Sequence, residues 1–362
     1  MANVDKVYKN LLENIVTNGD KKPAARAGMP GSTSLFAQQI QFDLREEFPI
    51  LTTKKVSFKN IKTELLWFLK GETSIKYLIE NGCNIWNDDA YRHFMGKVKE
   101  SLWGEDGHVN EGYITYYRER EDNPFNEKGE TLTKTEYLQK VLDTPSFEKH
   151  WGHLDLVYPY QWRNFGGKVP DDSYYSDQIG VDQIKEVLSS LKNQPFGRRH
   201  IVTAWNPQDV PYMGLPACHA FIQFNVAQVG ETFYLDCALT QRSADSVLGI
   251  PYNITSYALL THIFAKILGY TPRHLSMVLN DAHVYDNHME AVAELLTRDV
   301  TKFSTPDLEF SGIFDEVDKY WLDDAKEFDI DGFLSAMGSR DILFKTDYES
   351  YAPIKALLSV GV

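Results

Sequence analysis

Cys218 is the residue in this sequence with the clearest capacity for chemistry. It stands in the motif LPACH at residues 215–219, between a turn-like segment and a β-rich run. A thiolate is a strong nucleophile, and a neighbouring imidazole or guanidinium favours the thiolate form. A lone cysteine in a reducing compartment is more often a buried structural residue. Taken alone, these residues leave both interpretations open.

Four arginines and one glutamate could assist such a nucleophile. The arginines are Arg26, Arg198, Arg199 and Arg242. Their charge could hold a phosphate or stabilise a thiolate, although a single arginine more often lies in a surface ion pair. Glu64 lies within the apolar run TELLWFL. A carboxyl group there is either paired structurally or has a raised pKa that suits proton transfer.

The sequence has no pattern typical of a metal site or a phosphate-binding loop. Its ten histidines and three cysteines include no HExxH motif and no pair at zinc-finger spacing. A GxxxxGKS or GxxxxGKT loop is also absent. We therefore expect no bound metal and no P-loop chemistry.

Composition limits the classes of protein to which this chain can belong. Its 362 residues include 37 basic and 51 acidic side chains, a net charge of −14, and 43% are hydrophobic. That apolar content supports a sizeable core, and the acidic balance argues against a nonspecific nucleic-acid or anionic-membrane binder. The N-terminus has no apolar signal region, and no stretch approaches the ~20 apolar residues of a membrane span. We expect a soluble, cytoplasmic protein that needs no membrane or nucleic acid.

Hydrophobic periodicity predicts the elements that must position these residues. We expect helices over residues 4–15, 61–69, 74–80, 181–191, 253–268 and 286–296, and strands over 34–44, 199–205, 219–228, 232–240 and 275–285. Residues of about 90–152 are charged and turn-rich, which indicates an inserted lobe, and about 300–362 form an extended C-terminal segment. The pattern predicts an α+β fold in a single domain over 1–362.

Several segments together resemble the thymidylate synthase family. Gln241-Arg242-Ser243-Ala244-Asp245, followed by LGIPYNITSY at 248–257, resembles its nucleotide-binding signature. Further matches occur in the family's order: ELLWFL (64–69), NIW (84–86), Tyr158 with QWR (161–163), RR (198–199), AWN (204–206), CH (218–219), DAHVY (281–285) and IKA (354–356). The resemblance implies a thymidylate-synthase-like fold, with a large mixed sheet, long packed helices and a sheet-to-sheet homodimer.

The resemblance also implies substrates and a role for each site residue. Cys218 would add to C6 of the uracil ring of dUMP, with Glu64, Tyr158 and His219 as the other catalytic residues. The co-substrate 5,10-methylenetetrahydrofolate would contact Trp86 and Asp245. The implied dUMP-binding residues are Arg26, Arg242 and Ser243 on the phosphate, Arg198 and Arg199 on the phosphate from the partner subunit, His283 and Tyr285 on the sugar, Asn253 on the pyrimidine edge, and Gln241. An asparagine at 253 points to dUMP, because aspartate is typical of the family's cytosine-acting branch.

Departures from the family pattern bear on the product. They are Ala217, Asn280, Pro159-Tyr160, Asn225, Thr240, Tyr252 and a tail two residues longer than usual. The family reaches a C5 methylene intermediate, which hydride converts to dTMP and water converts to 5-hydroxymethyl-dUMP. From these departures we expect a dUMP hydroxymethylase of the kind that large DNA phages use for DNA modification, acting in the host cytoplasm if phage-encoded. The alternatives are a thymidylate synthase and a non-catalytic nucleotide- or RNA-binding relative.

Overall fold

A computed structural model of the chain describes residues 3–25, 28–102, 111–167, 179–322, 326–354 and 356. The chain divides into two compact units. The first consists of Met1–Ile61, Gln183–Thr203 and Cys218–Val362, and the second of Lys62–Asp182 and Ala204–Ala217. Helix α2 (Phe58–Lys70) runs across the boundary between them.

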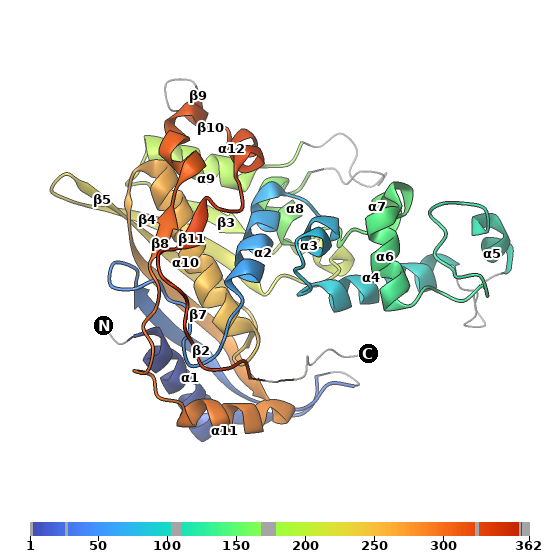
Figure 1. Ribbon diagram of the computed structural model, residues 1–362, viewed down its shortest axis with the longest axis horizontal. Coiled ribbons are helices and arrows are strands. Elements are labelled where there is room, and N and C mark those ends of the chain that lie inside the picture. Colours follow the sequence, from blue (N-terminus) through green and yellow to red (C-terminus); the bar gives the residue numbers. More distant parts are fainter. Residues whose placement is uncertain are drawn as a thin grey trace. The chain divides into compact units, whose positions relative to one another are not determined.

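The first unit is built on a seven-stranded mixed sheet (Figure 1). Its strand order is β1 (Asp20–Lys22), β2 (Ser32–Asp43), β7 (Thr271–Tyr285), β5 (Thr232–Gln241), β4 (His219–Val229) and β3 (Ile201–Thr203), with β6 (Ala244–Asp245) also paired to β7. Strands β5 and β6 run parallel to β7, and the other pairs are antiparallel. This arrangement confirms the predicted α+β class with a large mixed sheet.

Helix α10 (Gly249–Leu268) packs on β5 and β7 and supplies much of the core of the first unit. Nearly all of its residues are buried, as its apolar run predicts, and Phe264 meets Phe224 of β4 with ring centroids 5.1 Å apart. The helix ends at Gly269, whose φ of +74° lies in the left-handed region that glycine adopts without strain. Helices α1 (Val4–Asn18), α9 (Gln183–Asn193) and α11 (Met289–Thr297) complete the long helices of this unit.

The C-terminal segment of the first unit forms short elements around an aromatic cluster. These are β8 (Leu308–Phe310) paired with β11 (Ile342–Phe344), the 3₁₀ helix η3 (Gly312–Tyr320), β9 (Trp321–Leu322) paired with β10 (Glu327–Phe328), and α12 (Ile330–Ala336). Phe314, Phe328 and Phe333 are buried there, with Phe333 5.2 Å from Phe314 and 5.4 Å from Phe328 between ring centroids. The described part of the C-terminal segment therefore packs on this unit, and beyond β11 Tyr348 and Tyr351 bond to the backbone of Leu51 and Thr52.

His262 of α10 is half-buried, with its Nε2 atom buried, and its ring packs against this C-terminal segment. Its ring lies 5.7 Å from Phe48 and 6.4 Å from Phe310, and its Nε2 has no hydrogen-bond partner among the described residues. Burial lowers the pKa of His262 from its ordinary 6.5 to about 4. The unfolded chain therefore takes up a proton between pH 6.5 and 4 that the folded chain does not, and folding stability falls over that range as the pH falls.

The His262→Phe variant should lose less stability in acid than the unchanged protein. A shift of this size corresponds to about 3 kcal/mol of free energy of unfolding between pH 6.5 and 4. Urea unfolding at pH 7, 6, 5 and 4.5 would measure the difference. His150→Gln, at an exposed position, is the control and should follow the unchanged protein. Equal pH slopes for His262→Phe and the unchanged protein would refute a buried neutral imidazole.

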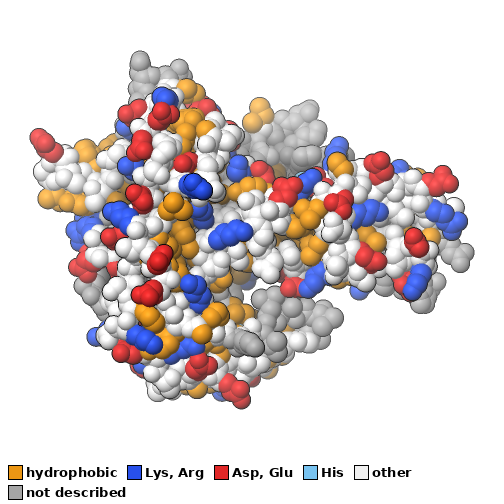
Figure 2. Space-filling model, in the orientation of Figure 1, with side chains coloured by type: hydrophobic (Ala, Val, Ile, Leu, Met, Phe, Trp, Pro, Cys, Tyr) orange, Lys and Arg blue, Asp and Glu red, His pale blue; other side chains and the backbone are white. Residues whose placement is uncertain are grey.

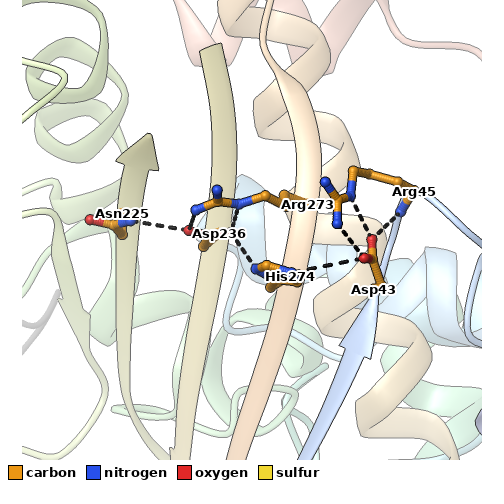
Figure 3. A network of polar contacts seen from close by, with 6 residues as sticks. All are labelled: Asp43, Arg45, Asn225, Asp236, Arg273 and His274. Carbon is orange, nitrogen blue, oxygen red and sulfur yellow. Dashed lines mark hydrogen bonds and ion pairs between the residues drawn. The ribbon is translucent and has the colours of Figure 1, made fainter. Parts of the chain in front are cut away.

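A polar network joins four strands on the sheet face opposite α10 (Figure 3). Asp236 of β5 accepts hydrogen bonds from Arg273 at 2.5 and 2.8 Å and from Asn225 at 3.0 Å, and its carboxylate lies 3.2 Å from His274 Nδ1. Asp43 binds Arg45 and lies 3.9 Å from His274 Nε2. The neighbouring guanidinium groups lower the pKa of both carboxyl groups, to about 2 for Asp43.

The second unit contains the predicted lobe and is more helical there than its sequence suggests. Residues 90–152 include most of α4 (Asn87–Leu102) and all of α5 (Glu111–Tyr117), α6 (Lys134–Asp143) and α7 (Pro145–Trp151). Each helix buries only a narrow apolar stripe, so its hydrophobic signal is weak. Thr133 and Glu136 form a capping box at the start of α6, and Phe94 stacks on Tyr137 at 4.6 Å.

The remaining elements of the second unit are short. They are α3 (Lys76–Glu80), α8 (Tyr158–Arg163) and the 3₁₀ helix η1 (Val210–Tyr212). Strand β3 of the first unit is also shorter than the predicted 199–205, because the chain turns at Asn206. The Asn206 side chain donates to Asp209 at 2.9 Å and accepts from the amide of Gln208 at 3.2 Å.

Within the described ranges, no helix is long and apolar enough to span a bilayer.

The surface carries charges of both signs. Figure 2 shows Lys and Arg side chains interspersed with Asp and Glu over the described part of one face. Opposite charges at this spacing partly cancel the field that a polyanion would meet. This face therefore carries no field of a single sign over its described part.

Candidate active site

The register of β4 and β5 brings Cys218 beside Arg242. His219 pairs with Gln241, and the Arg242 amide donates to the Cys218 carbonyl at 3.0 Å. The two side chains also meet, with Arg242 Nη2 3.7 Å from Cys218 Sγ. Cys218 is half-buried and Arg242 is exposed. A guanidinium at this distance stabilises the thiolate over the thiol, which favours the nucleophile interpretation over a structural cysteine.

Buried His219 and Gln241 form a polar group with half-buried Asn253 next to the cysteine. Gln241 Nε2 donates to Asn253 Oδ1 at 3.1 Å, and Asn253 is also hydrogen-bonded to His219. The His219 ring lies edge-on to Tyr257 at 5.2 Å. Burial lowers the pKa of His219 to about 4, so the imidazole is neutral at physiological pH. These contacts hold the Asn253 amide in one orientation.

The side-chain oxygen of Gln241 accepts no hydrogen bond from the other described residues of this group. Its side chain is 1% exposed, and its Oε1 has no hydrogen-bond partner among the described residues. A buried carbonyl oxygen in that state is costly unless a ligand or a water donates to it. The position is consistent with a site that is completed by a polar ligand.

Asp245 and Lys54 lie together at the start of α10. Asp245 Oδ1 accepts hydrogen bonds from the amides of Val247 and Leu248 at 2.8 and 3.0 Å. Lys54 Nζ donates to the Val247 carbonyl, and burial lowers its pKa to about 8. Lys54 belongs to none of the sequence motifs, although a lysine directly after the run FPILTT could have signalled a buried cation.

His283 and Tyr285 lie at the end of β7, next to β6. The pairing of β6 with β7 sets Asp245 opposite His283, and the Ser246 amide donates to the His283 carbonyl at 2.9 Å. His283 Nδ1 lies 3.0 Å from the Asp281 carbonyl, an arrangement in which Nδ1 carries the proton and donates it. The Tyr285 ring is edge-on to His283 at 4.8 Å.

The other predicted phosphate ligands are exposed or lie outside the described residues. Arg198 and Arg199 are exposed in the loop before β3, and they line a cavity of about 500 Å³ with Phe196. Ser243 is half-buried directly after Arg242. Arg26 lies outside the described residues.

Glu64, Trp86 and Tyr158 come together within the second unit. Trp86 Nε1 donates to Glu64 Oε1 at 2.7 Å, and the rings of Trp86 and Tyr158 lie edge-on at 6.0 Å. Tyr158 also stacks on Phe68 at 4.9 Å. Burial raises the pKa of Glu64 to about 7, although the Trp86 hydrogen bond opposes the shift. A carboxyl group with that pKa can accept or donate a proton near neutrality.

Most of the described site residues thus form two clusters, one in each unit, whereas Arg198 and Arg199 belong to neither. The chain that carries these clusters is similar to a family of known proteins. A sequence model described as thymidylate synthase matches residues 6–337.

The chain belongs to the thymidylate synthase family. The thymidylate synthase of Listeria monocytogenes serotype 4b (strain F2365) is 39% identical over 295 residues, which are 81% of this chain and 86% of that protein. The thymidylate synthase of Mesoplasma florum (strain ATCC 33453 / NBRC 100688 / NCTC 11704 / L1) is 39% identical over 293 residues, 81% of this chain and 85% of that protein. These matches confirm the family resemblance.

Members of the thymidylate synthase family are folate-dependent one-carbon transferases that bind dUMP and use methylenetetrahydrofolate as co-substrate. The donor set fits such a co-substrate in two places. Asp245 Oδ2 is left to accept from an N–H donor, because Oδ1 already holds two amides. Trp86 supplies an aromatic ring in the other cluster. No group of three or more His, Cys, Asp or Glu side chains suited to a metal occurs in the part of the chain that the structure describes.

Proposed function

We propose that this protein transfers a one-carbon unit to C5 of dUMP and forms dTMP. The observation that carries the proposal is the 3.7 Å approach of Arg242 Nη2 to Cys218 Sγ, one position along the strands from the Gln241–Asn253 hydrogen bond. In this proposal Cys218 supplies the thiolate, Arg242 binds the phosphate directly after β5, and Asn253 of α10 presents an amide to the base. That combination suits nucleophilic addition to a pyrimidine nucleotide.

Each cluster has a part in the proposed reaction. The Cys218 thiolate adds to C6 of uracil, so that the C5–C6 electron pair becomes available at C5. When bound, 5,10-methylenetetrahydrofolate supplies the carbon unit and the hydride. Glu64 transfers protons through ordered water, Tyr158 assists loss of the C5 proton, and expulsion of the Cys218 thiolate restores the C5–C6 double bond.

The remaining site residues bind the nucleotide in this proposal. Arg242 and Ser243 hold the phosphate with Arg26, and His283 with Tyr285 holds the sugar hydroxyl. The Asn253 amide pairs with the uracil edge, and His219 and Gln241 orient that amide. Arg198 and Arg199 act across a homodimer interface, and the protein works in the cytoplasm.

Relatives named thymidylate synthase, at 38–39% identity, support the methyl product over the hydroxymethyl product that the departures suggested. Two of those departures also have a structural explanation. Asn225 and Thr240 lie on the sheet face opposite α10, and Asn225 donates to Asp236 in the strand network. They therefore carry little weight for the product.

The hydroxymethylase remains a second candidate because of substitutions beside the first cluster. Ala217 is fully buried directly before Cys218, and Tyr252 directly precedes Asn253 in the first turn of α10. Asn280 is half-buried on β7, next to Asp281. Changes at such positions could alter which nucleophile, hydride or water, reaches the intermediate.

The deciding experiment follows the nucleotide's mass and dihydrofolate absorbance together. Purified protein is mixed with dUMP and 5,10-methylenetetrahydrofolate. The proposal requires a methyl mass increase with one dihydrofolate per nucleotide. A hydroxymethyl mass without dihydrofolate would replace it with the second candidate, and no product would support a binding-only protein.

The Asn253→Asp variant should change the choice of base. A carboxylate oxygen can still accept from Gln241 Nε2, so the local hydrogen bond survives while the amide's N–H donor is lost. We expect kcat/KM for dUMP to fall about 100-fold and turnover of dCMP to appear. Asn10→Asp, the same change at an exposed position of α1, should leave kcat/KM unchanged. Unchanged dUMP turnover with no dCMP activity would refute this account of base recognition.

A further inference from the structure

The second unit contains a cavity that the proposed reaction does not use. Its volume is about 570 Å³, and the lining residues that the structure describes all belong to this unit. Lys97 and Ser101 come from α4, Tyr117 from α5, and Lys149 from α7, while Asp155 lies in the segment that follows. Glu64, Trp86 and Tyr158 do not line it. The size is within the range of small-molecule sites, about 300–1,000 Å³.

The negative charge in this cavity is already compensated. Among the described lining residues, Asp155 is the one acidic side chain, and its Oδ2 lies 2.7 Å from Lys97 Nζ and 2.8 Å from His93 Nε2. Asp155 also has a φ of +57°, an unfavourable conformation for a residue other than glycine. The backbone of Asp155 thus keeps this conformation at the point where its carboxylate contacts Lys97 and His93.

Three hydrogen-bond donors that line the cavity are uncommitted. Lys149 Nζ, Ser101 Oγ and the Tyr117 hydroxyl form no hydrogen bond or ion pair with the described residues. The Lys97 ammonium has further N–H donors beyond the one that faces Asp155. Ser101 and Lys149 are exposed, so water can satisfy these donors in the free protein, and a ligand with several acceptor atoms can take its place.

We propose that this cavity binds a small aromatic phosphomonoester. The terminal oxygens of a phosphomonoester are acceptors that can be shared among donors from α4, α5 and α7. The rings of Tyr117, Trp151 and Tyr160, which line the same cavity, supply the apolar wall for an aromatic group. None of the described lining residues is one that the proposed reaction uses, and Arg242 belongs to the other unit.

Calorimetric titration of the full-length protein with phenyl phosphate tests the proposal. We expect saturable binding that Lys149→Glu weakens about tenfold or more and Ser101→Ala weakens less. The control Lys128→Glu reverses an exposed charge of the same unit and should change the affinity less than twofold. Phenol, which lacks the anion, should bind far more weakly, and benzoate tests whether a carboxylate can substitute.

An Arg242→Ala variant separates this site from the proposed active site. Phenyl phosphate binding that survives Arg242→Ala and is lost in Lys149→Glu supports the cavity. The reverse pattern would place the probe at the dUMP phosphate position and overturn the proposal. Absence of saturable binding, or binding that neither Lys149→Glu nor Ser101→Ala affects, would overturn it as well. Lys149 is exposed and unpaired, so its variant should unfold at the same temperature as the unchanged protein.

Discussion

Cys218→Ala should abolish turnover of dUMP and leave nucleotide binding intact. The variant loses the only atom that the proposal bonds to C6, and loss of a nucleophile typically lowers kcat by a factor on the order of 10⁴ or more. Arg242, Asn253 and Gln241 keep their positions, because Cys218 meets Arg242 through its backbone carbonyl as well as its thiol. Product formation by mass spectrometry and dUMP binding by calorimetry measure the two properties.

Cys237→Ala is the matched control for that variant. Cys237 lies on β5 of the same unit, but it is buried, and burial raises the pKa of its thiol to about 12. A thiol with that pKa cannot act as a nucleophile near neutrality, so Cys237→Ala should keep its activity. Turnover that survives in Cys218→Ala, or is lost equally in both variants, would contradict the assignment of Cys218.

Glu64→Gln should lower kcat by a factor of about 10² to 10⁴, the usual contribution of general acid–base catalysis. The amide oxygen of Gln can still accept the hydrogen bond that Trp86 Nε1 donates, so the surroundings are preserved while proton transfer is lost. The pKa of Glu64 is about 7. The activity of the unchanged protein should therefore show an inflection near that pH, and the residual activity of the variant should not.

The same variant makes an independent prediction about stability. The pKa of Glu64 is raised from 4.5 when unfolded to about 7 in the fold. The folded chain therefore binds the extra proton between these values, and stability falls as the pH rises from 4.5 through 7. Between pH 5 and 8 the unchanged protein should lose about 3 kcal/mol of its free energy of unfolding through this group. The Glu64→Gln variant should not show that loss.

Glu80→Gln is the control for both measurements, because Glu80 is exposed at the end of α3. It should match the unchanged protein in kcat and in the pH dependence of its unfolding. A Glu64→Gln variant within threefold of the unchanged kcat would exclude Glu64 from proton transfer. An unchanged stability slope would show that its carboxyl group is not buried as an acid.

The sequence by itself determined the features that depend on local pattern. The nearly uninterrupted apolar run of residues 253–268 predicted a buried helix, observed as α10. The β-rich runs predicted β4, β5 and β7 to within a few residues at each end. The ordered motifs pointed to the thymidylate synthase family. Such predictions succeed because side-chain periodicity and motif spacing are properties of neighbours in the chain.

Only the tertiary structure decided the environments in which those residues lie. Strand register brings Arg242 to Cys218 across 24 positions of sequence, and packing sets Trp86 against Glu64 and raises the pKa of that carboxyl group. The helices of the lobe, the buried Lys54 and the place of Asn225 in the strand network also escaped the sequence. Desolvation and hydrogen bonding depend on distances between residues far apart in the chain. Those distances exist only once the chain has folded.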